Sequence, residues 1–552
     1  MAGPAQYDYV IIGAGTAGTV LANRLSADPD VSVCLIEAGP RDNTPLVHIP
    51  SFVGTLLFHK DYSWGYTTVP QPQLGGRRIL LPRGKVLGGC SSTNGMVYFR
   101  GHPKDFDEWA AMGNTGWSFR ELLPYFIRSE NNVDYRNSTW HGTQGEMHVS
   151  HVRQYSPMIK PFLAATAGLG YPRCEDFNGC HDPVGFDVRQ NALHQGRRVS
   201  GVTAFLKPIV KRPNLTVLTD CFVNRIMVAN GRATGVDVQH ATIPRQLLAR
   251  REVLLCAGAY GSPAILQHSG IGDAAQLQTL GIPVQLHLPG VGRNLHDHPS
   301  SVVQMATSNS DSYGISWKAL PRNALSVLQY LLFRKGQIAG NLFEVTGFLR
   351  TRPELDRPDL QFVFMPATRP TPKFPFPIGH GFGVNSILLR PTSRGSVTIA
   401  SRDPHVAPHI DNAFLRDEAD VDTLLKGLRI ARRILAHPAM GKYEAHEILP
   451  GPALDRDDEL KDYMRQTCTA VHHPGGSCRM GVDADAVVDP QLRLRGLEGL
   501  RVVDASIFPR VVSGNTNAPA VMVAEKAADL ILGRHAPTPI DPPLQRDQSD
   551  ET

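Results

Sequence analysis

The sequence predicts an α/β fold of at least two domains, and two observations lead to this prediction. The first is size: 552 residues exceed what a single hydrophobic core usually organises. The second is local: residues 7–39 have the pattern of a strand, a glycine-rich turn, a helix and a second strand, which is the start of a parallel sheet. A content of 42% hydrophobic and 19% charged residues is ordinary for a globular protein.

The amino-terminal unit contains a phosphate-binding turn. Residues 7–12 are apolar apart from Asp8, as expected for a strand that is buried on both faces. Gly13, Gly15 and Gly18 then form G-x-G-x-x-G. The first glycine allows the tight turn, the second lets the backbone approach a pyrophosphate, and the third lets the helix pack on the strand.

The residues after this turn complete a dinucleotide site. A helix that begins near Thr16 directs free N–H groups and a positive dipole end towards phosphates. Glu37 ends the second strand, where a carboxylate accepts hydrogen bonds from ribose hydroxyls. We therefore expect Thr16, Ala17, Glu37 and Ala38 to contact a dinucleotide; the alternative is a tight βα turn without a ligand. NAD and FAD both use this unit.

Four further segments carry a family resemblance. They are residues 84–110 (GKVLGGCSSTNGMVYFRGHPKDFDEWA), 258–272 (GAYGSPAILQHSGIG), 288–299 (LPGVGRNLHDHP) and 499–532 (GLRVVDASIFPRVVSGNTNAPAVMVAEKAADLIL). In this order they resemble the motifs of the glucose–methanol–choline (GMC) flavin-dependent oxidoreductases, and the chain is most similar to the bacterial branch of choline and alcohol dehydrogenases. The resemblance implies a Rossmann-like FAD-binding domain and a cap domain built on an antiparallel sheet plus helices.

The resemblance also assigns contacts to FAD. The glycine-rich run from residue 84 to residue 95 offers backbone N–H groups that suit flavin oxygens and phosphates. Thr93 stands where some members carry a histidine that bonds covalently to the flavin, so we expect FAD to be held non-covalently. The further residues that the resemblance places at the isoalloxazine, the adenine or the ribityl–pyrophosphate portion are Val86, Gly88, Asn94, Gly95, Val97, Val223, Ala257, Asp504, Ala505 and Asn517.

By the same resemblance the FAD-binding domain is discontinuous. We expect it to comprise residues 1–155, 195–310 and 460–540, with residues 156–194 and 311–459 forming the cap over the flavin. Alternating patterns at 360–366 (LQFVFMP) and 395–401 (GSVTIAS) favour strands in the cap. Residues 417–437 predict an amphipathic helix that begins with acids and ends with bases. The polar tail, residues 541–552, is expected to be disordered.

Oxidation of an alcohol through a flavin requires a base for the hydroxyl proton and a group that holds the oxygen. The run VHHPGGSCRMG, residues 471–481, resembles the family segment in which the histidine before the proline is the base. This histidine is His473, and we expect the side chain of His472 to point elsewhere. The resemblance places its partner at Asn515, which donates a hydrogen bond but cannot take a proton. The alternatives are a structural imidazole for His473 and a turn residue for Asn515.

Two positions in the expected cap bear on the substrate. Glu344 matches a family glutamate in the substrate-side segment, and its alternative role is a structural salt bridge or hydrogen bond. Val363 stands where choline-type members carry a histidine, which argues against choline as the substrate. We expect no metal site, because His473 and Cys478 lack a second pair of ligands at a known spacing.

The sequence therefore predicts FAD-dependent oxidation of a CH–OH group to an aldehyde or ketone, with oxygen or another electron acceptor. The alternative is a hydroxynitrile lyase-type, non-redox flavoprotein of the same fold. A net charge of +5 without a basic run interleaved with aromatics argues against a nucleic-acid partner. No apolar stretch is long enough to span a membrane. The early first strand and eight cysteines without a CxxC pair favour a cytoplasmic protein. Neither the particular alcohol nor the oligomeric state follows from the sequence.

Overall fold

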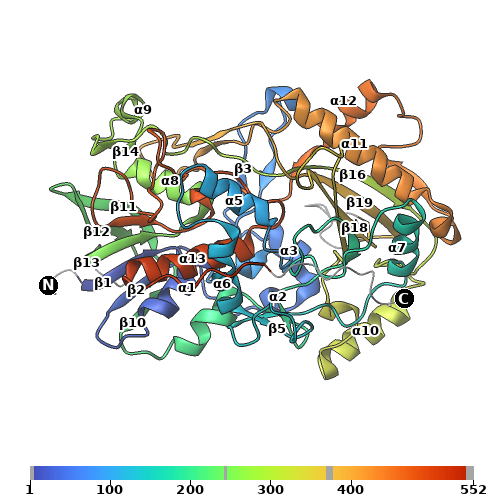
Figure 1. Ribbon diagram of the computed structural model, residues 1–552, viewed down its shortest axis with the longest axis horizontal. Helices are drawn as coiled ribbons and strands as arrows, with labels where there is room; N and C mark the ends of the chain where they lie inside the picture. The colour runs from blue at the N-terminus through green and yellow to red at the C-terminus, as the bar shows by residue number, and fades with distance from the viewer. Residues whose placement is uncertain (1–4, 242–244, 369–376, 543–552) are drawn as a thin grey trace.

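Two seven-stranded sheets organise the chain in the computed structural model, which describes residues 5–241, 245–368 and 377–542. The two sheets lie at opposite ends of the molecule in Figure 1, with the amino terminus beside the first of them. Of the tail that was expected to be disordered, residues 543–552 lie outside the described ranges.

The first sheet is the mostly parallel layer that the amino-terminal pattern predicts. Its order is β10–β2–β1–β13–β12–β11, and β24 pairs with the second half of β13. The strands β10, β2, β1, β13 and β24 are parallel, whereas β12 and β11 complete the sheet in antiparallel fashion. Their bounds are β1 Ala5–Ile12, β2 Val33–Ile36, β10 Leu215–Leu218, β11 Phe222–Ala229, β12 Arg232–Gln239, β13 Gln246–Leu255 and β24 Leu500–Val502.

Helices from both ends of the chain cover this sheet. α1, Thr16–Leu25, follows β1 directly, and α13, Asn517–Ile531, packs beside it although about five hundred residues separate them in the sequence (Figure 1). Both helices bury almost every residue. α1 packs on β1, β2 and α13, whereas α13 packs on α1 and on α6, Phe119–Ser129. The amino ends of α1 and α13 therefore lie close together.

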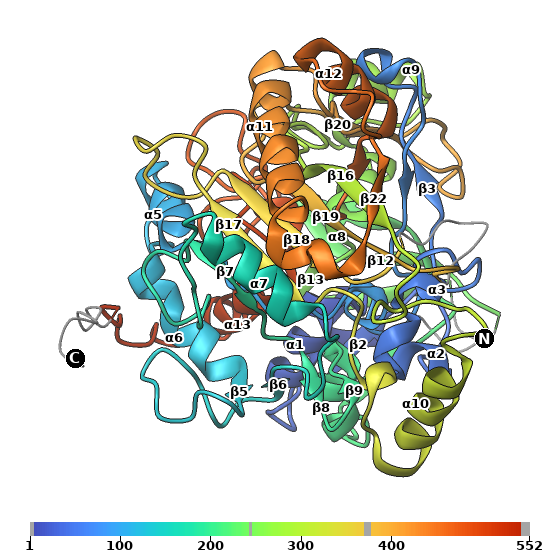
Figure 2. The same cartoon turned by 90° about the vertical axis from the view of Figure 1, so that its right-hand side faces the viewer.

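The second sheet is antiparallel, as expected for the cap. Its order is β22–β16–β19–β18–β17–β7, and β23 pairs with β16. The predicted helix is confirmed as α11, Glu418–Leu435, which crosses this sheet and is capped by Asp417 (Figure 2). The strands are β7 Gly185–Val188, β16 Pro299–Ala306, β17 Val345–Leu349, β18 Leu360–Met365, β19 Gly381–Leu388, β22 His446–Leu449 and β23 Thr469–Ala470.

The second sheet draws strands from outside the ranges that were expected for the cap. β16 and β23 fall inside the expected FAD-binding ranges, yet both pair within the antiparallel sheet. The strand predicted at residues 360–366 is β18, a fully buried member of this sheet. The strand predicted at 395–401 forms as β20, Ser396–Thr398, but it pairs only with β21, His409–Asp411, beside α8 and not within the larger sheet.

The remaining elements are short and connect the two layers. The helices are α2 Pro45–His48, α3 Val53–Leu57, α4 Cys90–Thr93, α5 Pro103–Ala111, α7 Ile159–Gly168, α8 Gly258–His268, α9 Ala274–Thr279, α10 Leu320–Phe333 and α12 Asp457–Thr467. Two-stranded ladders are formed by β3 Tyr66–Thr67 with β4 Leu80–Leu81, β5 Glu130–Asn132 with β6 Met147–Val149, β8 Leu193–His194 with β9 Arg197–Arg198, and β14 Ile271–Gly272 with β15 Leu286–His287. No helix in the described ranges is long and apolar enough to cross a membrane.

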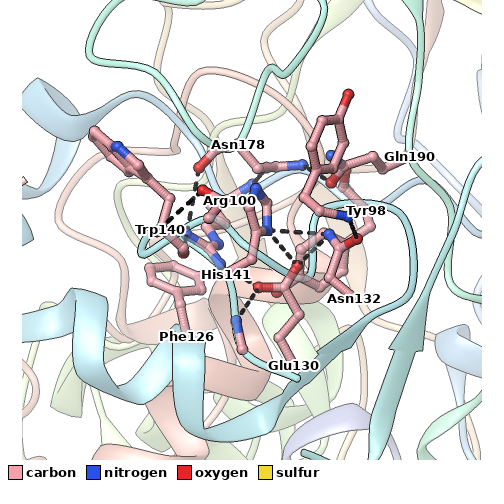
Figure 3. A network of polar contacts seen from close by, with 12 residues as sticks. Tyr98, Arg100, Phe126, Glu130, Asn132, Trp140, His141, Asn178 and Gln190 are labelled. Atoms are coloured by element: carbon pink, nitrogen blue, oxygen red, sulfur yellow. Dashed lines mark hydrogen bonds and ion pairs between the residues drawn. The ribbon is translucent and has the colours of Figure 1, made fainter. Parts of the chain in front are cut away.

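A buried ionic network connects α6 and β5 with the segment that precedes β7 (Figure 3). Arg100 and Glu130 form an ion pair in which both side chains are almost completely buried. His141 places Nδ1 2.9 Å from Glu130 and Nε2 2.9 Å from Asp176. Asn178 accepts from the Arg100 backbone N–H at 2.9 Å. Because charged groups without partners are costly to bury, this network fixes the path of residues 174–190 against the first layer.

Candidate active site

A cavity of about 1220 Å³ lies between the two sheets. One side of it is lined by Ile12 and Ile36, the last residues of β1 and β2, and by Cys256, which directly follows β13. Val302 of β16 and Gln361 of β18 line the opposite side. Ligands of open α/β sheets bind beyond the carboxyl ends of the parallel strands, so this cavity lies where such a fold places its cofactor.

The turn after β1 has the form that a pyrophosphate needs. Gly13 has φ +96°, a conformation that favours glycine. A methyl group added at Gly15 would meet no protein atom within 4 Å, whereas one at Gly18 would overlap the Gly13 carbonyl oxygen. Gly15 therefore leaves open space on the cavity side, and Gly18 allows α1 to pack on β1. Gly18 does not line the cavity, in keeping with this packing role.

Three helices begin at the cavity wall. Thr16, Gly258 and Asn517 are the first residues of α1, α8 and α13, and all three line the cavity. The Thr16 hydroxyl donates to the Asn517 side-chain oxygen at 2.9 Å and so joins two of these helix ends. Helix amino ends present unpaired N–H groups and a positive dipole end, which suits the two phosphates of a dinucleotide.

Two buried carboxylates lie beside these helix ends. Glu37 accepts from the backbone N–H groups of Ala14 at 3.1 Å and Gly39 at 2.9 Å. Burial raises the pKa of Glu37 to about 7. Asp504 accepts from the Gly258 N–H at 2.8 Å and the Ser262 hydroxyl at 2.6 Å, and burial raises its pKa. Each carboxylate is thus fixed in direction by backbone donors at the cavity wall, as hydrogen bonding to ribose or ribityl hydroxyls requires.

The structure brings most of the predicted site residues to this one cavity. Those that line it, together with Thr93, are Gly13, Gly15, Thr16, Ala17, Glu37, Ala38, Asn94, Gly95, Val97, Val223, Ala257, His473, Asp504, Ala505, Asn515 and Asn517. Gly18, Val86, Gly88 and Glu344 do not line it.

Val86 and Gly88 were expected to contact FAD, and the structure places both of them behind the cavity wall. Val86 is completely buried. The Gly88 N–H donates to the Ala14 carbonyl at 2.8 Å, and a side chain at Gly88 would overlap the Ser92 hydroxyl. Both residues therefore hold the glycine-rich segment against the turn after β1, and the wall itself is formed further along the segment by residues such as Asn94 and Gly95.

Glu344 is also placed away from the cavity wall. Its carboxylate accepts from the Tyr313 hydroxyl and, at 3.0 Å, from the Ser156 backbone N–H. Burial raises the pKa of Glu344 to about 7. Because both oxygens already have donors inside the protein, the structural alternative for Glu344 fits the geometry better than a substrate contact. Its neighbour Phe343 lines the cavity instead.

His473 and Asn515 meet at the centre of the cavity wall. The Asn515 Nδ2 lies 2.9 Å from the His473 Nε2, although 42 residues separate them in the sequence. Burial lowers the pKa of His473 well below 6.5, and His298, His472 and Arg83 lower it further. The imidazole is therefore neutral near pH 7, with Nε2 as an acceptor and the Asn515 amide as a donor beside it.

The sequence reasoning missed two residues that position His473. His298 Nδ1 lies 3.1 Å from His473 Nδ1, and Asp297 accepts from the His473 backbone N–H at 2.8 Å. Both belong to the segment 288–299, which the sequence analysis used only for the family resemblance, and its HDHP letters were the available signal. His472 was expected to point elsewhere, but it also lines the cavity, and Arg83 donates to its carbonyl at 2.8 Å. In the described ranges no cluster of His, Cys, Asp or Glu is arranged to hold a metal ion.

Comparison with known proteins decides the family. The amino-terminal model of the GMC oxidoreductases matches residues 7–300, and the carboxy-terminal model matches residues 391–524. The chain is a GMC oxidoreductase. This confirms the family resemblance and the α/β fold class with its antiparallel second layer.

Named relatives match this GMC oxidoreductase over nearly its whole length. An alcohol dehydrogenase [acceptor] from Pseudomonas putida is 40% identical over 529 residues, covering 95% of this chain and 96% of the relative. An oxygen-dependent choline dehydrogenase from Sinorhizobium fredii is 40% identical over 531 residues, covering 96% of each. The solved structure of an FAD-dependent oxidoreductase from Chaetomium thermophilum has a TM-score of 0.85 at 28% identity and covers 96% of this chain and 99% of that one.

These findings define the cofactor. The cavity has the open glycine turn, the three helix ends and the two oriented carboxylates that FAD requires, and the family and its structural neighbours use FAD. FAD is therefore the cofactor of this GMC oxidoreductase. The names of these relatives give no support to the hydroxynitrile lyase alternative.

Proposed function

We propose that this GMC oxidoreductase oxidises the CH–OH group of an alcohol to an aldehyde or ketone, with His473 as the base. The observation that carries the proposal is the contact of 2.9 Å between His473 Nε2 and Asn515 Nδ2 at the cavity wall. A neutral acceptor and a neutral donor side by side match the two needs of a hydroxyl group, which has a proton to lose and an oxygen to be held. Relatives named alcohol dehydrogenase and choline dehydrogenase support this chemistry.

The chain's own residues act in a defined order. The hydroxyl group of the substrate replaces the His473–Asn515 contact, so that its proton faces His473 Nε2 and its oxygen accepts from Asn515 Nδ2. His473 takes the proton as negative charge develops on the oxygen, and the amide donor stabilises this charge. Bound FAD supplies the acceptor for the hydride from the carbinol carbon. Asp297 holds the backbone of His473 and so fixes the direction of the imidazole.

The proposal includes non-covalent FAD. Thr93 lines the cavity at the position where some members carry the linking histidine, and a threonine hydroxyl cannot make that bond. Val363, which replaces the histidine of choline-type members, lines the cavity as well, and this supports an alcohol other than choline. Oxygen or another acceptor completes the cycle.

The expected domain division belongs to the proposal too. An FAD-binding domain of residues 1–155, 195–310 and 460–540 and a cap of residues 156–194 and 311–459 agree with most strands of the two sheets. The pairing of β16 and β23 supports assigning Pro299–Ala306 and Thr469–Ala470 to the cap. Eight free cysteines support the proposed cytoplasmic location.

The test is anaerobic mixing of the FAD-loaded protein with primary alcohols while the flavin absorbance is followed. His473→Ala should slow flavin bleaching by about 10²–10⁴-fold, the usual contribution of a general base, with FAD still bound. His472→Ala is the matched control and should slow it far less. Bleaching at an undiminished rate in His473→Ala would contradict the assignment of His473 as the base. Release of cyanide and aldehyde from a cyanohydrin without bleaching would favour the lyase.

A further inference from the structure

The segment around α10 has an amphipathic pattern opposite to that of an ordinary surface helix. Leu320, Leu325, Leu328, Leu331, Leu332 and Phe333 are between 52% and 66% exposed. We call these six residues the outer face of α10. The side of the helix turned to the protein carries polar residues instead: Ser326 is buried, and Asn323 donates to the Gly314 carbonyl at 3.0 Å.

Such a face needs an apolar environment. A surface helix normally directs its apolar stripe to the core and its polar face to water, and contiguous apolar patches of this kind mark interaction sites. α10 lies at the edge of the molecule in both views, away from the two sheets (Figures 1 and 2). Its 14 residues are too few to cross a bilayer, so the helix can only lie along a surface.

The charges around α10 indicate what that surface is. From residue 312 to residue 343 the sequence has no acidic residue, whereas Lys318, Arg322, Arg334 and Lys335 are basic. Lys318 and Lys335 are exposed at opposite ends of the outer face, and Trp317 beside the first of them is 81% exposed. Exposed tryptophan and lysine at the margins of an apolar helix face are typical of helices that lie in the interface of an anionic bilayer.

We propose that the outer face of α10 binds the surface of a bilayer that contains anionic lipids. The leucines and Phe333 enter the acyl boundary, Trp317 lies at the headgroup level, and Lys318 and Lys335 contact lipid phosphates. The chain continues from α10 to Leu342 and Phe343, which line the cavity.

Vesicle co-sedimentation of the FAD-loaded, full-length protein tests this proposal. Vesicles of phosphatidylcholine with phosphatidylglycerol should bind the protein at least about tenfold more strongly than phosphatidylcholine alone. The triple variant Leu325→Gln, Leu328→Gln, Leu332→Gln should lose at least about tenfold in binding. Val482→Gln is the matched control, because Val482 is 59% exposed and lies outside α10.

Charge reversal tests the electrostatic part. Lys318→Glu with Lys335→Glu should lower binding to phosphatidylglycerol vesicles about tenfold. The proposal is overturned if the wild type binds neither vesicle, or binds both equally. It is also overturned if light scattering shows a dimer that the triple leucine variant dissociates, because a second copy of the chain then covers the outer face.

A different observation, inside the cavity, concerns the substrate and rests on the proposed function. Arg189 follows β7 directly, lines the cavity, and is only 4% exposed. Among the described residues neither its Nε nor its Nη2 has a hydrogen-bond partner. Its guanidinium carbon lies 5.5 Å from the ring centre of Phe343, which also lines the cavity.

The only carboxylate that acts on Arg189 from inside the described structure is directed elsewhere. Glu344 interacts with Arg189 at longer range, but its two oxygens accept from Tyr313 and Ser156. Burial lowers the pKa of Arg189 to about 9. A buried guanidinium with free donors is costly unless a ligand supplies an anion, and a carboxylate matches its planar donors in bidentate geometry.

We infer that Arg189 binds a carboxylate on the alcohol substrate, so that the preferred substrates are hydroxy acids whose hydroxyl group reaches His473. Binding of hexanoate to the FAD-loaded protein tests the site without turnover, through the change in flavin absorbance. Arg189→Met should weaken this binding about 100-fold, since a buried charge pair loses its partner. The ratio of kcat/KM for ω-hydroxyhexanoate to kcat/KM for hexanol should fall by a similar factor.

The outcomes separate this inference from the proposed function. Hexanoate binding that depends on Arg189, without oxidation of any alcohol, supports the carboxylate site and contradicts the proposed oxidation. Equal hexanoate binding by wild type and Arg189→Met overturns the inference. Loss of FAD from Arg189→Met also overturns it, because Arg189 then serves the cofactor. Arg189→Lys should restore only part of the affinity, because lysine lacks the bidentate donors.

Discussion

His473 and His298 face each other through their Nδ1 atoms at 3.1 Å, so one ring must donate and the other accept. Asn515 donates to the His473 Nε2 and thereby leaves the ring proton of His473 on Nδ1. His298 therefore accepts at Nδ1 and carries its own proton on Nε2. This Nε2 has no hydrogen-bond partner among the described residues, and burial lowers the pKa of His298 to about 4, so the ring is neutral near pH 7. His298 is a positioning residue that fixes the tautomer of the base.

The pH dependence of kcat/KM follows from these contacts. His473 accepts a proton only when neutral, so activity falls as the pH drops through its pKa. Burial, and then His298, hold this pKa well below 6.5, so wild-type kcat/KM should stay constant down to pH 6.5. His298→Ala removes one cause of the lowered pKa, and the acid limb should therefore move to higher pH. We also expect kcat to fall about 10–100-fold, since the support of an orienting partner is lost. Steady-state kinetics from pH 5 to pH 9 measure both effects.

A purely structural His298 would give another result. In that case His298→Ala would lower the melting temperature and the amount of bound FAD without moving the acid limb. Measurement of FAD content at each pH separates the two readings, because loss of cofactor scales kcat without changing its pH profile. An acid limb in the same place as in the wild type contradicts the positioning role.

At the residue scale, the sequence was sufficient to predict the location of some residues of the candidate site but not of others. The meeting of His473 and Asn515 in one cavity could be predicted, because each lies in a motif whose order along the chain resembles the family; their catalytic roles stay a prediction. His298 and Arg189 could not be predicted, since their roles depend on contacts between distant segments: His298 meets its partner 175 residues away. Glu344 was expected at the substrate because of its motif, but Tyr313 and Ser156 occupy its oxygens.

The elements at the amino end show why one glycine turn serves two purposes. Gly15 has φ −75° and faces open space, so its lack of a side chain serves the ligand and not the backbone. Gly18 lies inside α1 against the Gly13 carbonyl, so its lack of a side chain serves the packing of helix on strand. Within one motif, Gly15 thus serves cofactor binding and Gly18 serves stability.

Alanine substitutions at these two glycines should therefore affect different properties, one FAD affinity and the other stability. Gly15→Ala should raise the FAD dissociation constant at least about tenfold, while the apoprotein keeps its wild-type melting temperature. Gly18→Ala should destabilise the apoprotein by about 2 kcal/mol, because the methyl group meets backbone that cannot move aside. Fluorescence titration with FAD and thermal unfolding of the apoproteins measure the two quantities. Equal FAD affinity in wild type and Gly15→Ala would contradict the placement of the cofactor.

Elements with strong local patterns were predicted well, and those defined by their neighbours were not. α1 begins at the predicted residue after its glycine turn, and α11 begins and ends near the predicted residues, because its Asp417 cap and its apolar periodicity lie in the local sequence. β20 was predicted as a strand, but its partner strand was not, since pairing is not encoded locally. The apolar residues of α10 would ordinarily be expected in the core, and only the fold shows that they face outward.

At the scale of the whole molecule, the network in Figure 3 couples folding to pH. Burial raises the pKa of Glu130, but Arg100 and His141 outweigh it and hold the pKa below 4.5. Burial lowers the pKa of His141, but hydrogen bonds to Asp176 and Glu130 outweigh it and raise the pKa above 6.5. Both ring nitrogens of His141 face carboxylate oxygens, which is the environment of an imidazolium ion.

The sign of each shift defines the pH range of greatest stability. Because folding lowers the pKa of Glu130, its carboxylate stabilises the fold above pH 4.5. This contribution is lost as the pH falls through the folded-state pKa. Because folding raises the pKa of His141, its imidazolium ion stabilises the fold below pH 6.5. This contribution is lost as the pH rises through the folded-state pKa. The network should therefore contribute most between pH 4.5 and 6.5. His141→Gln should flatten the fall in melting temperature above pH 6.5, whereas His268→Gln, a control with a pKa lowered to about 4 by burial, should not.

Glu130→Gln tests the network as a connection between the two layers. The substitution leaves Arg100 buried without its counter-charge and should lower the free energy of unfolding by about 3–5 kcal/mol. The double variant Glu130→Gln, Arg100→Met should recover part of this loss, because no charge is then left unpaired. Denaturant unfolding at pH 6 measures both variants. If the network joins the layers, Glu130→Gln should also make residues 174–190 exchange their amide hydrogens faster than β1 and β13 do, since this segment is held by Arg100, His141 and their partners. Uniformly faster exchange across both sheets would show that the network adds stability without connecting them.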